Sequence, residues 1–270
     1  MLSIKKVSPL QVLIILVFFS IIILLLFLPK SKSKEKAILN VIPIDTTLSI
    51  DLNFYAQQKK DIDSVIKLYQ NQKLSVEEVI TIFQKQRQPA LTAYFEELKY
   101  LQSPIDTTWF YLGKNYYNAL GFISNPSEAD PLIASAARCF NKAILLNDKN
   151  TNARIMLASC YVQTNNPMLG VKILKEIEKT DSNNVLLQTQ LAEFSLRSNQ
   201  LDKAIQRYQK ALQLDSTKIE IYAYLSEIYM QKKDTLQSLY FLRKFAARIS
   251  DTTLKNSINH YIYSIENQKK

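Results

Sequence analysis

The second half of the chain repeats itself every 34 residues, and three units align without a gap: 151–184, 185–218 and 219–252. In each unit leucine stands at position seven, a small residue at positions eight and twenty, and a large apolar or aromatic residue at position twenty-four. The residues are, at position seven, Leu157, Leu191 and Leu225; at position eight, Ala158, Ala192 and Ser226; at position twenty, Gly170, Ala204 and Ser238; and at position twenty-four, Leu174, Tyr208 and Leu242. Such a repeat predicts stacked helical hairpins, because one hairpin cannot bury its own apolar face. The small residues let the two helices of each hairpin approach closely.

An earlier unit, residues 106–150, carries the same pattern with an insertion of eleven residues between its halves. The residues that carry the pattern are Trp109, Leu112, Gly113 and Tyr116, followed after the insertion by Ala136, Phe140 and Ala143. We expect a helix over about 106–121, a long loop, and a helix over about 131–146 that Asp130 caps.

The four units resemble the tetratricopeptide repeat (TPR), whose pattern is W-x2-L-G-x2-Y followed by small and aromatic residues over 34 positions. The resemblance covers about 106–252 and implies an all-α fold, a TPR-type α-solenoid of stacked helical hairpins. It also implies a concave groove, lined by the first helix of each unit, that binds a protein partner as a peptide or a helix. Carried over by position, the groove residues are Phe110, Tyr117, Ile155, Val162, Glu193, Leu196, Arg197, Glu227 and Met230.

Two features qualify this expected groove. The branch of the family that clamps a terminal carboxylate uses lysine at position five and asparagine at position nine, and the units 151–184, 185–218 and 219–252 have neither there. The helical segment before the repeats could also fold back over the groove and turn its apolar stripe into ordinary core. The sequence leaves the open and the covered groove as alternatives.

The segments that flank the repeats are also expected to be helical. Residues 54–105 read as a helical cap or as degenerate repeats that continue the stack. Residues 253–270 read as a C-terminal capping helix, because Leu254, Ile258, Tyr261, Ile262 and Ile265 form one apolar stripe. His260 falls on the opposite, polar face and is expected to face solvent.

An uncharged apolar run over 10–28 predicts a transmembrane anchor, between a short basic tail (1–9) and a linker (29–53). The alternative is a cleaved signal peptide, but the run is long for one and no small-residue cleavage site comes after it. The lysine count slightly favours a cytoplasmic main domain, whereas a basic tail before an apolar run is typical of signal anchors that export the domain behind them. Our interpretation is a single-pass membrane protein with an extracytoplasmic, periplasmic-type domain.

Composition argues against an enzyme, a cofactor or a metal site. Three glycines are too few for a phosphate-binding loop, and one histidine with two cysteines is too few for a metal centre built from these residues. Cys139 and Cys160 are interpreted as buried free thiols, and a disulfide between them is an alternative only if the domain is exported. The net charge is +10, and half of the excess lies in residues 1–40, beside the apolar run. That distribution suits anionic lipid rather than nucleic acid.

These observations predict a membrane-anchored TPR scaffold that mediates protein–protein interaction. The alternatives are a structural envelope-associated protein without a peptide ligand, and an enzyme with an unrecognised helical active site.

Overall fold

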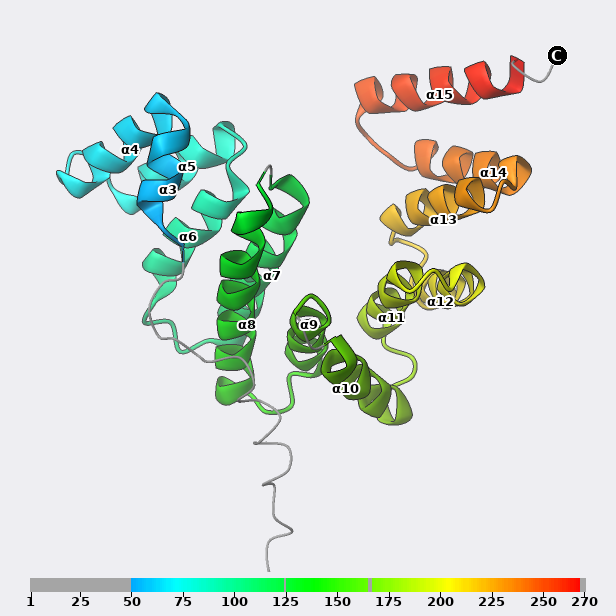
Figure 1. Ribbon diagram of the computed structural model, residues 1–270, viewed down its shortest axis with the longest axis horizontal. Coiled ribbons are helices and arrows are strands. Elements are labelled where there is room, and N and C mark those ends of the chain that lie inside the picture. The colour runs from blue at the N-terminus through cyan, green and yellow to red at the C-terminus, as the bar shows by residue number, and fades with distance from the viewer. Residues whose placement is uncertain (1–49, 124, 165–166, 268–270) are drawn as a thin grey trace, which may run out of the picture. The chain divides into compact units, whose positions relative to one another are not determined.

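The computed structural model describes residues 50–123, 125–164 and 167–267, and every regular element in these ranges is helical (Figure 1). The N-terminal helices are α3 (Leu52–Gln58), α4 (Lys60–Gln70), α5 (Val76–Lys85) and α6 (Pro89–Tyr100). The next elements are α7 (Asp106–Ala119), the 3-10 turns η1 (Leu120–Phe122) and η2 (Pro126–Glu128), and α8 (Ala129–Leu146). The remaining helices are α9 (Thr151–Val162), α10 (Pro167–Thr180), α11 (Val185–Arg197), α12 (Leu201–Leu214), α13 (Glu220–Gln231), α14 (Thr235–Ala246) and α15 (Thr252–Asn267).

The chain divides into two units, Met1–Ile44 and Asp45–Lys270, and the described residues all belong to the second. The basic tail (1–9), the apolar run (10–28) and most of the linker (29–53) therefore lie outside the described residues. In the described ranges, none of the helices combines the length and apolarity needed to cross a bilayer. The end of the expected linker is already helical, because α3 begins at Leu52 with the Asp51 carboxylate accepting a hydrogen bond from the Asn53 amide.

The expected hairpins form: α7 packs on α8, α9 on α10, α11 on α12, and α13 on α14. The boundaries of two units coincide with asparagine caps. The Asn150 side chain accepts a hydrogen bond from the Ala153 amide, and the Asn184 side chain accepts one from the Leu187 amide. An asparagine at this place satisfies amide groups that the first turn leaves unpaired, so the first helix of each of these units begins directly after the cap.

The close approach expected at positions eight and twenty is confirmed. A Cβ atom added at Gly170 would lie 2.3 Å from the carbonyl oxygen of Ala158 on the facing helix. In the last hairpin the hydroxyl oxygens of Ser226 and Ser238 are 3.1 Å apart. Larger side chains at these positions would force the two helices of a hairpin apart.

The segment before the repeats contributes a further hairpin, α5–α6, which is joined by the same turn as α11–α12 and α13–α14. In these turns Arg87, Asn199 and Lys233 adopt positive φ angles of 54°, 54° and 61°. In each turn the amide of the next residue donates a hydrogen bond to the carbonyl oxygen five residues earlier. The pairs are Gln88 to Phe83, Gln200 to Ser195, and Asp234 to Tyr229. This is the hydrogen bond that closes a helix with a left-handed residue after its C-terminus.

A buried ion pair fixes α6 against the first repeat. Glu97 is 1% exposed and accepts three hydrogen bonds from the guanidinium of Arg138 on α8, the shortest at 2.6 Å. The hydroxyl of Tyr116 on α7 donates to the same carboxylate at 2.7 Å. Because a buried charge is costly without partners, this three-helix network specifies how α6 sits on α7 and α8.

Two expected boundaries at the insertion need correction. The first helix ends as an α-helix at Ala119 and continues only as the turn η1. The second helix begins at Ala129 rather than Pro131, so Asp130 is not its cap. It comes directly after η2, whose start is capped by the Asn125 side chain accepting from the Ser127 amide. A second short capped turn therefore replaces part of the expected loop.

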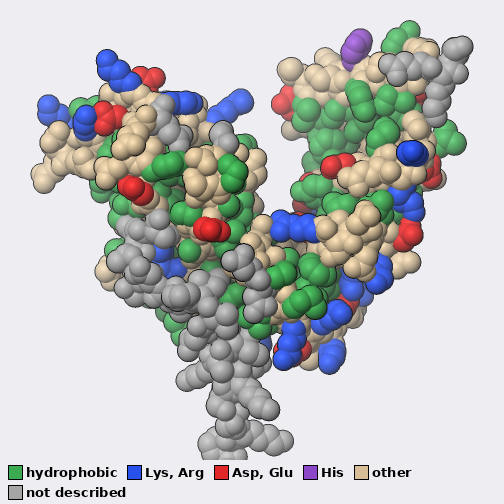
Figure 2. Space-filling model, in the orientation of Figure 1, with side chains coloured by type: hydrophobic (Ala, Val, Ile, Leu, Met, Phe, Trp, Pro, Cys, Tyr) green, Lys and Arg blue, Asp and Glu red, His purple; other side chains and the backbone are tan. Residues whose placement is uncertain are grey.

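The C-terminal helix α15 packs on α14, but only Ile262 of its apolar stripe is buried. Leu254 is 45% exposed and Tyr261 is 51% exposed. His260 is exposed, as expected (Figure 2). The helix α15 therefore covers the end of the stack incompletely, and this leaves a cavity beneath it.

Candidate binding face

Among the described residues, three cavities lie at one recurring place in the stack, between a hairpin and the first helix of the next unit, and a further cavity lies apart from them at the turn between α4 and α5. The N-terminal cavity lies between α5–α6 and α7, the central cavity between α9–α10 and α11, and the C-terminal cavity between α13–α14 and α15. The linings of the central and C-terminal cavities share five repeat positions: nine, twelve and twenty-four of the hairpin, and six and nine of the following helix. We call the surface that carries these cavities the first-helix face.

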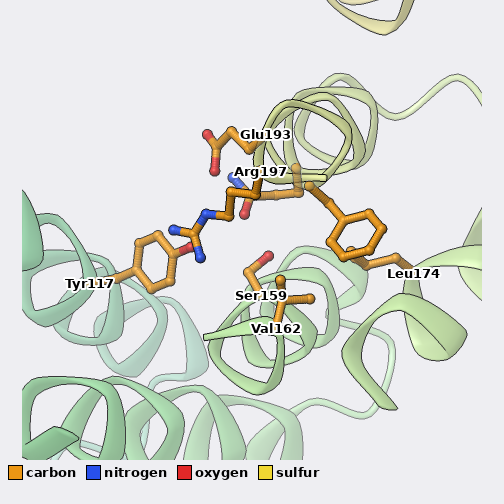
Figure 3. Close-up of a pocket in the computed structure, with 8 residues that line it drawn as sticks. Tyr117, Ser159, Val162, Leu174, Glu193 and Arg197 are labelled. Atoms are coloured by element: carbon orange, nitrogen blue, oxygen red, sulfur yellow. The ribbon is translucent and has the colours of Figure 1, made fainter. Parts of the chain in front are cut away.

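The central cavity brings together four residues predicted for the groove: Tyr117, Val162, Glu193 and Arg197. Figure 3 shows the Arg197 side chain extending toward Tyr117 across the opening, with Ser159 and Val162 on the neighbouring helix. The side-chain amide of Gln163 donates a hydrogen bond of 2.9 Å to the Tyr117 hydroxyl. The enclosed volume is about 10 Å³, which is roughly the space for one water molecule. These side chains already fill the site among themselves.

Burial controls the electrostatics of the central cavity. Loss of solvent raises the pKa of Glu193 to about 7, and this effect is opposed by the nearby Arg197 charge and by a hydrogen bond from Gln190. Burial, and then the proximity of Glu193, also raises the pKa of Tyr117. A carboxyl group that titrates near neutral pH beside an arginine can change the charge of this part of the face within the physiological range.

The central cavity is small, and its serine hydroxyl group is already hydrogen-bonded. The Ser159 hydroxyl donates a hydrogen bond of 3.0 Å to the carbonyl oxygen of Ile155 in its own helix, rather than to the side chain of a base. In the described ranges, no three or more His, Cys, Asp or Glu side chains are grouped so that they could hold a metal ion. The geometry is that of a contact surface with a polar centre.

Two further predicted residues, Glu227 and Met230, line the C-terminal cavity of about 420 Å³. Its other wall comes from α15, through Ser257, Ile258 and Tyr261. Our sequence interpretation placed Ile258 and Tyr261 in a capping stripe and missed them as site residues. The signal was present, because a further 34-residue step starts at Thr253 and places Ile258 at position six and Tyr261 at position nine.

The N-terminal cavity, about 430 Å³, was not predicted. The turn at Arg87 aligns Gln84 with position twelve and Glu96 with position twenty-four, which are positions that line the other two cavities. From α7, Asn115 and Asn118 complete the wall, and the Asn115 amide donates 2.6 Å to the Glu96 carboxylate. The face therefore extends one hairpin further toward the N-terminus than the sequence pattern indicated.

Three predicted groove residues serve mainly in packing. Ile155 is fully buried between α9, α10 and α11, so it does not reach a ligand. Phe110 is half-buried, with its ring 5.9 Å from that of Phe140. Leu196 is half-buried and packs on the core cluster that contains Ala192 and Tyr208. Position five in the first two units and position twelve in unit 185–218 therefore point toward a neighbouring helix rather than outward.

The alternative of a covered groove concerns the N-terminal helices. Within the described part of the chain, α3–α6 pack on one another and α6 packs on α7, but none packs extensively on α9, α11 or α13. Val162 is half-buried by the core cluster of its own neighbours, which includes Ile155, Leu174 and Leu191. The helices α3–α6 continue the stack and leave the first-helix face of the later units uncovered.

Comparison with known families supports one repeat directly. Residues 196–233, which span α12 and α13, match the family model for the TPR repeat. The chain contains a TPR repeat. The aligned units on either side carry the TPR spacing of small and large residues into the neighbouring hairpins. No curated protein matches the chain in sequence.

Solved structures similar to the chain include other TPR-like folds. The structure titled MamA 41-end from Desulfovibrio magneticus RS-1 is 17% identical, and the match covers 68% of this chain and 94% of that one with a TM-score of 0.39. A structure of YrrB, described as a TPR protein with an unusual peptide-binding site, is 16% identical, covers 72% of this chain and 96% of that one, and has a TM-score of 0.39. These values carry no information about what this chain binds.

Proposed function

We propose that the protein is a membrane-anchored TPR scaffold that binds another protein through its first-helix face. The observation that carries the proposal is the recurrence of cavities at equivalent repeat positions along that face. A surface with openings at several places along a stack of hairpins suits an extended or helical segment of a partner better than a small substrate. The apolar run 10–28 supplies the anchor, and the domain lies on the extracytoplasmic side of the membrane.

Two positions on the face are suitable for testing it. Arg197 is exposed beside the central cavity, and Met230 is half-buried at the wall of the C-terminal cavity. The double variant Arg197→Glu/Met230→Asp places two negative charges on the face. We expect quantitative partner capture from detergent-solubilised membranes to fall at least about tenfold, because Met230→Asp introduces a charge that resists desolvation against an apolar ligand and Arg197→Glu reverses the charge beside the central cavity.

The matched control is Lys179→Glu/Leu236→Asp, which makes the same kind of changes at exposed positions of the second helices α10 and α14. Both proteins should melt within about 2–4 °C of the unmodified chain, corresponding to about 1 kcal/mol. Loss of capture in the control alone, or undiminished capture by a folded Arg197→Glu/Met230→Asp protein, would contradict the proposal.

A further inference from the structure

The C-terminal cavity has apolar walls built from three helices. Ala223 and Met230 come from α13, Leu242 from α14, and Ile258 and Tyr261 from α15. Its polar floor is already engaged, because the Ser226 and Ser238 hydroxyl groups hydrogen-bond to each other. At about 420 Å³ the space is within the range of ligand sites and can accept one large apolar side chain.

Acidic side chains flank this cavity along one stripe of α13. Glu220, Ala223 and Glu227 recur at spacings of three and four residues, so they share a face of the helix. Glu220 and Glu227 are exposed, and neither pairs with a cation in the described part of the chain. The stripe therefore presents two unneutralised carboxylates beside an apolar opening.

An aromatic pair extends the same stripe toward the preceding unit. The rings of Tyr208 and Tyr224 stack with their centroids 5.4 Å apart, and Tyr224 is 37% exposed. Burial raises the pKa of Tyr224, followed by the charges of Glu193, Glu220 and Glu227, so all three carboxylates lie around this ring. A partly exposed aromatic ring among carboxylates favours a cation.

We propose that the C-terminal cavity anchors an apolar side chain from a basic segment of the protein partner, with a lysine or arginine of that segment paired to Glu227 and Glu220. The inference rests on the proposed function, since it assigns the chemistry of the partner at one part of the first-helix face. Desolvation of the apolar side chain supplies affinity, and the charge pairing selects basic over acidic segments.

The experiment uses three fluorescent 12-residue peptides and the full chain in detergent, with empty micelles as the blank. The first peptide has one leucine flanked by lysines in a Gly/Ser background. The second has glutamates in place of the lysines, and the third has alanine in place of the leucine. We expect fluorescence anisotropy to show binding of the first peptide, at least about tenfold weaker binding of the third, and no binding of the second.

Two variants separate the charge from the cavity. Glu220→Gln/Glu227→Gln should weaken binding of the first peptide at least about tenfold and make that binding less dependent on salt concentration. The control Glu176→Gln on α10 should do neither. Ala223→Leu fills the cavity and should lower the affinity of the leucine peptide to that of the alanine peptide. The control substitution Gln209→Leu, at an exposed position of α12, should leave both affinities unchanged.

Equal binding of the lysine and glutamate peptides, or no binding of either, overturns the inference. So does an Ala223→Leu protein that binds the leucine peptide normally. If Ala223→Leu changes only the oligomeric state in sedimentation, the cavity is a contact between two copies of the chain, and the inference is wrong. If the peptides do not bind but Arg197→Glu/Met230→Asp still reduces partner capture, only this inference is wrong. If the double variant also leaves partner capture unchanged, the proposed function is wrong as well.

Discussion

Ser226 and Ser238 face each other across the last hairpin, with their hydroxyl oxygens 3.1 Å apart and both side chains buried. They occupy positions eight and twenty of their unit, where the other units have alanine or glycine. The pair shows why a polar residue is accepted between two closely packed helices. One hydroxyl group donates a hydrogen bond to the other at the distance that the small positions impose.

A double-mutant cycle tests this pairing. Ser226→Ala or Ser238→Ala alone leaves one buried hydroxyl group without its partner and should lower the free energy of unfolding by about 1–3 kcal/mol. The double variant removes both hydroxyl groups and should be close to the unmodified chain. Denaturant titration of the four proteins measures the coupling, and Ser216→Ala in an exposed turn serves as the control. Additive losses would show that the two hydroxyl groups do not support each other.

Glycine substitutions test the close approach of the helices. Gly170→Ala would put a methyl group 2.3 Å from the backbone oxygen of Ala158 and should cost about 1–3 kcal/mol of stability. Gly121 has no atom within 4 Å of an added Cβ and does not have a positive φ. Gly121→Ala should therefore stabilise the chain by about 0.4–1 kcal/mol. Thermal melting compares the two, and a stable Gly170→Ala protein would contradict the packing described.

The pattern of small and large residues was sufficient to predict the hairpins, because it reports directly on helix spacing. It left residues 54–105 as either a cap or degenerate repeats, because the turn of the hairpin α5–α6 is closed by Arg87 rather than by the glycine or asparagine that favours a positive φ. It also could not show that Ile155 is core and that Tyr261 lines a cavity. Both outcomes depend on how tightly one helix covers the next, and α15 buries only Ile262.

The half-buried carboxyl group of Glu193 should make stability depend on pH. Burial raises its pKa in the folded chain from 4.5 to about 7, while the unfolded chain keeps the ordinary value. Between these values the folded state retains a proton that the unfolded state has released, so stability falls as pH rises toward 7 and is constant above it. The loss is at most about 3 kcal/mol.

Glu193→Gln should remove this slope and be more stable than the unmodified chain at pH 8. Chemical denaturation at pH 5 and pH 8 provides the comparison, and Glu176→Gln, at an exposed position, should retain the slope. If both variants show the same pH dependence as the unmodified chain, Glu193 is not the group responsible.

The anchor can be tested independently of the fold. Ile22→Arg should make membrane insertion less favourable by about 2.5–3.5 kcal/mol, whereas Ser33→Arg in the lysine-rich linker should have little effect. Deleting residues 1–30 should release a folded protein from membranes. Resistance of the truncated chain to carbonate extraction would show that another segment holds it there.

A reporter fused after Lys270 determines the side of the membrane, and activity only in the cytoplasm would contradict the orientation proposed.

Site-specific photocrosslinking tests the central claim most directly, because it records which surface touches the partner. A photoreactive side chain is placed in turn at Arg197 on the first-helix face and at Gln231, which occupies the same repeat position in the next unit. The comparison positions are Lys179 and Leu236 on the second helices, and all four are exposed. In native membranes the account predicts a discrete protein adduct from Arg197 and Gln231 and none from Lys179 and Leu236. Adducts that form from the second helices while the first-helix face stays unlinked would contradict it.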